Sequence, residues 1–167
     1  MAQASQRSEH SPAVPGLERF LDRVRARAAQ AGVFGEVVVG DQRVSCTAKG
    51  SAEPAEDRIA LEDGRLWVSL VTPNRWLSQS IEADLVHTGD KLEDLIEEEL
   101  VDQGYTGDPL PYEHFRSRDM LFSFRSPVPV DLGALGDDAS VERAVQCLLA
   151  YEACFRRLGD MDAGEDD

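Results

Sequence analysis

The stretch RIALEDGRLWVSLV, residues 58–71, contains the strongest turn signal in the chain and decides the fold. Asp63-Gly64 separates two β-rich runs, and this pair suits a type I′ turn, which requires positive φ at both central residues. Apolar side chains alternate along the second run and therefore share one face of a strand: Leu66, Val68 and Leu70. We expect an antiparallel hairpin with strands at residues 58–62 and 65–71.

The residues before this hairpin predict a second one. β-Rich runs at residues 36–39 and 43–49 are separated by residues 40–42 (GDQ), whose glycine can adopt positive φ. Residues 50–57 are small, acidic and contain a proline, which is typical of a loop. Together the two hairpins predict a meander of four strands.

The residues after the hairpin predict further strands. Residues 72–74 (TPN) interrupt the pattern, because proline lacks the N–H that a sheet ladder needs. The segment 76–86 fits either a strand or a helix, and we expect a strand as far as Ile81. Residues 112–116 and 119–125 predict a later pair of strands, the second rich in aromatic side chains.

Three segments have apolar residues at three- and four-residue spacing, which is typical of amphipathic helices. The first spans residues 15–31 and is expected to end at Gly32. The second begins with Asp90 and Glu93, which form a capping-box pattern. The third runs from about residue 138 to residue 158.

The order of these elements is helix, four strands, an optional fifth strand, helix, two strands and helix. It predicts an α+β fold in which three helices flank one antiparallel sheet. With 167 residues, of which 42% are hydrophobic, the chain fits one domain. We expect that domain at residues 15–158, with a disordered arm at residues 1–14 and an acidic, disordered tail at residues 159–167.

The charge of the chain argues against some classes of partner. The net charge is −15, and most of the excess lies in residues 82–102 and 159–167. Binding to the phosphate backbone requires a cationic surface, so a nucleic-acid partner is not expected. No segment contains the run of about 18 apolar residues that a membrane span needs, so no membrane is expected either.

The cysteine pattern predicts a reducing compartment. Cys46, Cys147 and Cys154 are an odd number and form no CxxC pair. Cys147 and Cys154 are seven residues apart on the predicted terminal helix, which at 1.5 Å per residue is about 10 Å and too far for a disulfide. We therefore expect structural thiols in a cytoplasmic protein, with a metal or redox role as the minor alternative.

No local signature of catalysis or cofactor binding is present. The sequence lacks G-x-S-x-G, P-loop, H-E-x-x-H and G-x-G-x-x-G patterns. His87 and His114 lie where a boundary residue and a strand residue are expected, and neither has a motif around it. The alternate acids at the end of the chain lack the later bidentate ligand of a calcium loop. We expect no catalytic residue, no metal and no cofactor.

Two tryptophans and one phenylalanine are the candidates for contact with a partner. Trp67 alternates with the apolar face of its strand and so lies on the other face, where it either packs in a core or contacts a partner. Trp76, beside Arg75, has the same two interpretations. Phe155 extends the apolar stripe of the terminal helix and is a candidate anchor to an assembly.

The element order resembles the type III secretion chaperone-like fold, which secretion chaperones share with the YbjN family. Five segments support this resemblance: the helical stripe 17–24, the strand 65–71, the helix 92–100, the aromatic strand 120–124 and the long helix 141–158. The resemblance implies a small, acidic, often dimeric protein that binds extended segments of another polypeptide. It implies no catalytic residue, nucleotide or metal.

The sequence therefore favours a non-enzymatic peptide- or protein-binding module of chaperone-like or regulatory type. The partner is expected to be a protein or peptide, and a homodimer is possible on the same surfaces. One alternative is a small enzyme in which acids and His87 or His114 come together only in the folded chain. Another is a structural subunit held in a larger assembly through Phe155.

Overall fold

The computed structural model describes residues 14–49, 54–117 and 120–165, and a six-stranded antiparallel sheet lies at its centre. The strands are arranged in the order β1-β2-β3-β4-β6-β5. Their bounds are β1 Val37–Gly40, β2 Arg43–Thr47, β3 Glu56–Glu62, β4 Arg65–Thr72, β5 Glu113–Arg116 and β6 Phe122–Pro127. The predicted α+β architecture with an antiparallel sheet is confirmed.

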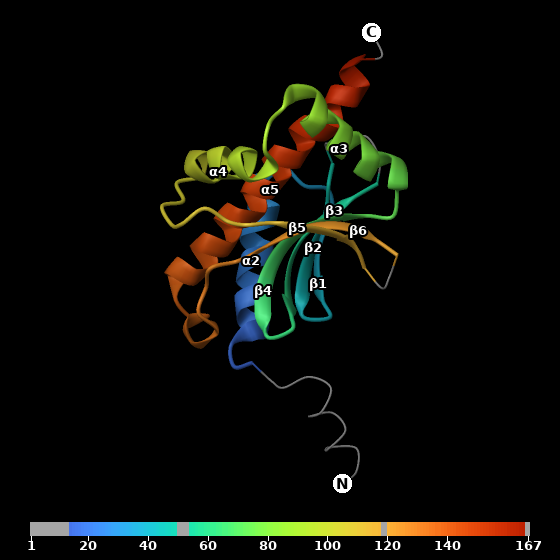
Figure 1. Ribbon diagram of the computed structural model, residues 1–167. Coiled ribbons are helices and arrows are strands. Elements are labelled where there is room, and N and C mark those ends of the chain that lie inside the picture. Colours follow the sequence, from blue (N-terminus) through green and yellow to red (C-terminus); the bar gives the residue numbers. More distant parts are fainter. Residues whose placement is uncertain (1–13, 50–53, 118–119, 166–167) are drawn as a thin grey trace.

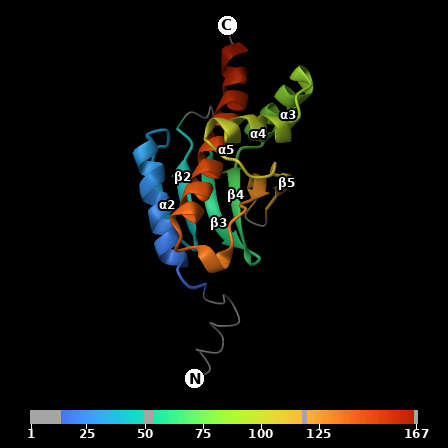
Figure 2. The same ribbon diagram turned by 90° about the vertical axis from the view of Figure 1, so that its left-hand side faces the viewer.

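The helices of the described residues cover one face of this sheet. They are α2 Leu17–Ala31, α3 Arg75–Thr88, α4 Leu92–Asp102, the short 3-10 helix η1 Leu132–Ala134 and α5 Asp138–Glu165. Figure 1 shows α2, α4 and α5 on the same side of the strands. In Figure 2, α2 and α5 lie in front of β2, β3 and β4, and α3 lies beyond the end of the sheet. Among the described residues, no helix crosses the opposite face of the sheet.

The turns of the first four strands follow local backbone chemistry. Asp63 and Gly64 have φ values of 53° and 76°, as a type I′ turn requires, so the central hairpin is confirmed. In the first hairpin, Asp41 and Gln42 have positive φ, at 55° and 62°. The expectation that Gly40 supplies the positive φ is wrong, because Gly40 is the last residue of β1 and pairs with β2.

The strand expected as far as Ile81 is wrong, because this segment forms helix α3. Asn74 caps the helix: its side-chain oxygen accepts a hydrogen bond from the backbone N–H of Leu77 at 2.8 Å. Leu77 and Ile81 are four residues apart and both are buried, so they lie on one helix face. Gly89, with a φ of 78°, ends the helix.

Two smaller predictions are also corrected. β3 begins at Glu56, so the expected loop at residues 50–57 ends earlier, while its residues 50–53 lie outside the described part. Asp90 does not cap α4, because Lys91 occupies the N-cap position and makes no side-chain cap bond. The apolar stripe of α4 is buried as expected: Leu92, Leu95, Ile96 and Leu100.

The structure describes most of the C-terminal end of the chain but little of the N-terminal end. The expected disordered arm, residues 1–14, lies almost entirely outside the described residues. The helical backbone of α5 continues to Glu165, beyond Leu158 where the sequence pattern places its end. The expected tail from Gly159 is therefore helical in its backbone up to that point, and residues 166–167 lie outside the described residues.

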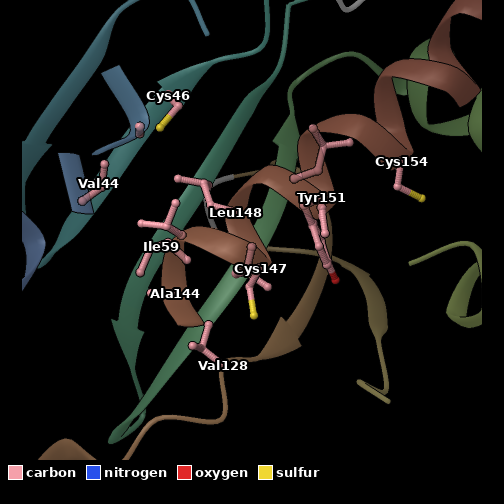
Figure 3. Close-up of a cluster of buried hydrophobic side chains, with 14 of the residues drawn as sticks. Val44, Cys46, Ile59, Val128, Ala144, Cys147, Leu148, Tyr151 and Cys154 are labelled. Atoms are coloured by element: carbon pink, nitrogen blue, oxygen red, sulfur yellow. The ribbon is translucent and has the colours of Figure 1, made fainter. Parts of the chain in front are cut away.

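The hydrophobic core fills the space between the sheet and helices α2 and α5. Figure 3 shows side chains from β2, β3 and α5 that meet there: Val44, Ile59, Ala144 and Leu148. The hydroxyl of Tyr151 in this cluster is satisfied, because it lies 2.6 Å from that of Ser126 in β6.

The three cysteines belong to this core. Cys46, Cys147 and Cys154 are buried, and none of the three forms a disulfide. Burial raises the pKa of Cys46 and Cys147 to about 12, so both thiols stay protonated near neutral pH. The prediction that these cysteines form no disulfide is confirmed.

Candidate functional site

The two faces of the sheet have different chemistry. Strand register places one row of side chains across the helix-free face, from the β1 edge to the β5 edge: Val38, Ser45, Arg58, Ser69, Arg125 and Glu113. We call this helix-free side the open face. The opposite side of the same strands carries the apolar core residues, so polar and charged side chains are concentrated on the open face.

Trp67 lies on the open face, as its position in the strand predicts, yet it is buried. The guanidinium of Arg125 lies 3.7 Å from the centre of the Trp67 ring, which is cation–π geometry. Glu62 and Glu113 hold Arg125 in place through ion pairs of 2.9 and 3.0 Å. The indole N–H also donates to the backbone oxygen of Glu62 at 3.1 Å. Trp67 therefore contacts a partner only if Arg125 moves.

An open groove runs over the same face. Its floor contains Val71 and Ser69 of β4, and Phe115 of β5 stands at one side. The lining includes three arginines, Arg43, Arg58 and Arg125, and two acids, Glu62 and Asp63. The groove therefore combines apolar surface with a positive balance, although the whole chain carries a net charge of −15.

The outer edge of β1 is the most exposed apolar part of the sheet. β1 pairs with β2 on one side, and in the described residues its other side has no strand partner. Val38 and Val39 are 46% and 40% exposed, and they point to opposite faces. A second open groove lies between the end of β1 and α2. We call it the edge groove, and its apolar lining is Val14, Leu17, Leu21 and Val39.

The opposite edge, β5, contains a histidine beside a carboxylate. The Nδ1 of His114 lies 2.9 Å from the carbonyl oxygen of Ser123, which only accepts, so Nδ1 carries the proton. Its Nε2 lies 3.2 Å from Glu82 and 3.4 Å from the hydroxyl of Ser78, both on α3. The imidazole stacks on Phe124 with the ring centres 3.9 Å apart.

This histidine group connects β5 to α3, and it bears on the alternative of a small enzyme. That alternative asks for a histidine beside a carboxylate in a deep pocket. His114 and Glu82 meet the first condition, but Ser78 is buried and His114 lines neither groove described above. His87 lies in the last turn of α3, apart from this group. The geometry fits a link between two elements.

The three predicted partner contacts do not come together. Trp67 is on the open face, while Trp76 is on α3 and is 52% exposed. Phe155 is buried on the helix side of the sheet, where its ring packs against Phe124 and Tyr151 at 5.1 and 5.3 Å. Of the three, only Trp76 is exposed, and Phe155 is part of the core.

The sequence analysis missed the residues that shape both grooves. Val38 and Val39 carried a usable signal, because a short run of valines next to a tight turn is typical of an edge strand. Arg125 carried none, since its position over Trp67 depends on the pairing of β4 with β6, which are far apart in the sequence.

No protein-family model, curated protein or solved structure matches this chain. The resemblance to the secretion chaperone-like fold therefore stays a prediction. Among the residues that the structure describes, no helix is long and apolar enough to cross a membrane. Within that same part of the chain, no three His, Cys, Asp or Glu side chains are grouped so that they could hold a metal ion.

Proposed function

We propose that this chain is a non-enzymatic module of chaperone-like type that binds an extended, apolar segment of another polypeptide along β1. The observation that carries the proposal is the unpaired outer edge of β1, with Val38 and Val39 exposed beside the edge groove. An edge strand offers unpaired N–H and C=O groups to a further strand. Three cysteines outside any disulfide suit a cytoplasmic setting.

The two faces next to β1 supply the specificity in this proposal. Side chains of an added strand alternate, so every second one points toward α2 and meets the edge groove. Leu17 and Leu21 of α2 line that groove and favour apolar side chains. The remaining side chains point to the open face, where Arg43 of β2, paired with Gly40 of β1, favours a carboxylate. The expected partner segment therefore alternates apolar residues with polar or acidic ones.

Two other interpretations have less support from the same geometry. A structural subunit anchored through Phe155 lacks its anchor, because that side chain is buried in the core of this chain. A second copy of the chain, pairing edge to edge through β1, is the competing occupant of the proposed site. The experiment below distinguishes this homodimer from a separate partner.

The test is an NMR titration of the full, ¹⁵N-labelled chain with unlabelled peptides of alternating apolar and acidic residues. We expect shifts confined to the amides of β1, β2 and the first half of α2. The double variant Val38→Lys/Val39→Lys should weaken binding at least tenfold, because charged residues block strand addition at an edge. The matched control is Val86→Lys, at a residue 82% exposed on α3, which should bind like the wild type.

Two results would overturn the proposal. One is a peptide library that perturbs no amide of β1, or binding that the double variant leaves intact. The other is a wild-type dimer in light scattering that the double variant converts to a monomer, since a second copy then occupies the edge.

A further inference from the structure

A second exposed surface lies at the β5 side of the sheet, which is the side opposite to β1. The half-buried ring of Phe122, in β6, is at its centre. The guanidinium of Arg75, the first residue of α3, lies 5.6 Å from the centre of this ring. The guanidinium of Arg116, the last residue of β5, lies 5.2 Å from the same centre. Three elements therefore bring two cations to one aromatic ring.

These two arginines have no acidic partner within the described residues. Both are exposed, and neither takes part in an ion pair there. Glu82, on the same helix as Arg75, is paired instead with His114 at 3.2 Å. The chain has 32 acidic residues against 17 lysines and arginines, so two neighbouring cations without a carboxylate stand out from the charge of the whole molecule.

Two exposed apolar side chains extend this surface. Trp76 follows Arg75 in the first turn of α3 and is 52% exposed, and Met120 precedes Phe122 by two residues and is 56% exposed. Met120 has a φ of 66°, a left-handed conformation that costs free energy for a bulky residue and that glycine adopts readily. Such strain is concentrated at sites of binding and catalysis, so it is an independent sign of a contact. We call Arg75, Trp76, Arg116, Met120 and Phe122 the arginine patch.

We propose that the arginine patch binds an acidic segment of a protein partner that carries an aromatic side chain. Charge complementarity identifies the acidic part, since a guanidinium binds a carboxylate through two parallel hydrogen bonds. The exposed indole of Trp76 offers a flat apolar surface to the aromatic part. Tryptophan, arginine and methionine are also the residue types enriched at protein interfaces. The net charge of −15 disfavours nucleic acid as the source of the anionic groups.

The arginine patch is separate from the site of the proposed function. β1 and β5 are the two outer strands of the sheet, and none of the patch residues lines the edge groove. The inference therefore does not rest on the proposed function, and either surface can fail its test without the other.

The test is an NMR titration of the full, ¹⁵N-labelled chain with an end-blocked peptide in which a phenylalanine lies between glutamates. Prolines in this peptide prevent it from adding to β1 as a strand, because proline lacks the N–H that a ladder needs. We expect saturable shifts at the amides of β5, the start of β6 and the first turn of α3, and affinity that falls as salt is added. The same peptide with glutamine in place of glutamate should bind at least tenfold more weakly.

The double variant Arg75→Gln/Arg116→Gln should weaken binding of the acidic peptide at least tenfold. The matched control Arg19→Gln/Arg65→Gln removes the same charge from two exposed arginines elsewhere and should bind like the wild type. Met120→Gly separates a contact from a structural role. It should unfold at the same or a higher denaturant concentration, because glycine relieves the left-handed strain, and yet bind more weakly.

The inference is overturned if the acidic peptide does not bind, if its glutamine analogue binds equally well, or if the double variant binds like the wild type. Shifts confined to β1 and β2 would place the peptide at the other edge and would overturn it too. A second copy of the chain is the competing occupant. Self-association in light scattering that the double variant abolishes would show that the arginine patch joins two copies, and would exclude a separate acidic partner.

Discussion

The buried carboxyl group of Asp57 lowers the stability of the folded chain, and the packing of the rest of the core must compensate for this loss. Its folded-state pKa is raised above the ordinary value of 3.8, so the folded chain keeps a proton that the unfolded chain has released. The contribution of Asp57 to stability is therefore least unfavourable below about pH 4, and it becomes more unfavourable as pH rises toward the folded-state pKa.

This argument predicts how Asp57→Asn changes stability. At acid pH the variant and the wild type should differ little, because both side chains are neutral. As pH rises above about 4, the variant should become the more stable by up to about 1.4 kcal/mol per pH unit, because the folded wild type retains a proton that its unfolded chain releases. Urea unfolding between pH 4 and pH 8 measures the difference. A difference that stays constant with pH, or that Asp94→Asn on the exposed face of α4 reproduces, contradicts the assignment.

The burial of Trp67 by Arg125 gives a second prediction for single residues. In a Trp76→Phe background, where Trp67 is the remaining tryptophan, Arg125→Ala should shift the emission to longer wavelength and increase quenching by acrylamide. We expect a loss of about 1 kcal/mol from the free energy of unfolding. Arg65→Ala is the matched control, since Arg65 lies 5.1 Å from the same ring and should matter less. Equal spectra for both variants would refute the role of Arg125 as a cover.

At the scale of elements, helix α3 depends on its cap. Asn74→Ala should lower the free energy of unfolding by about 1 kcal/mol, because the N–H of Leu77 loses its acceptor. Asn74→Asp keeps an acceptor at the same place and should retain most of the stability. Denaturant unfolding and far-UV circular dichroism measure both effects. If the aspartate variant loses as much as the alanine variant, capping is not the role of Asn74.

The elements that the sequence predicted are those whose signals are local. The Asp63-Gly64 turn needs two positive φ angles. An Asp-Gly pair between two β-rich runs predicts such a turn from adjacent residues alone. Helix α3 was missed because its buried face includes serines as well as Leu77 and Ile81, which weakens the apolar period. Its cap at Asn74 was interpreted as a turn, since asparagine favours both.

The buried carboxyl group and the candidate site were harder to predict than the fold. Asp57 was assigned to a loop because small and acidic residues precede it, although its alternation with Ile59 already fits a strand. The cover that Arg125 forms over Trp67 depends on which strands are neighbours, and the chain brings β4 and β6 together across two helices. Such pairings are set by the packing of the whole domain, so a local pattern does not reveal them.

At the scale of the whole molecule, the net charge of −15 opposes compaction. A large share of it lies on the exposed face of one helix, α4, through four acids there: Glu93, Asp94, Glu97 and Glu98. Like charges three or four residues apart on a helix repel each other. Added salt weakens this repulsion, because it shortens the Debye length, the distance over which charges interact in solution. The acidic face is therefore a solvated surface that lowers stability at low ionic strength.

The melting temperature should rise by about a few degrees as salt increases from about 0.01 M to about 0.1 M, because the Debye length falls from about 30 Å to about 10 Å. The variant Glu97→Lys/Glu98→Lys should have a higher melting temperature at low salt, because it replaces two of the repelling negative charges with positive ones. Its melting temperature should also rise less when salt is added. Charge-neutral sucrose serves as a control for general solvent effects. Calorimetry at both ionic strengths measures the two slopes, and parallel slopes for wild type and variant would show that α4 is not the origin of the effect.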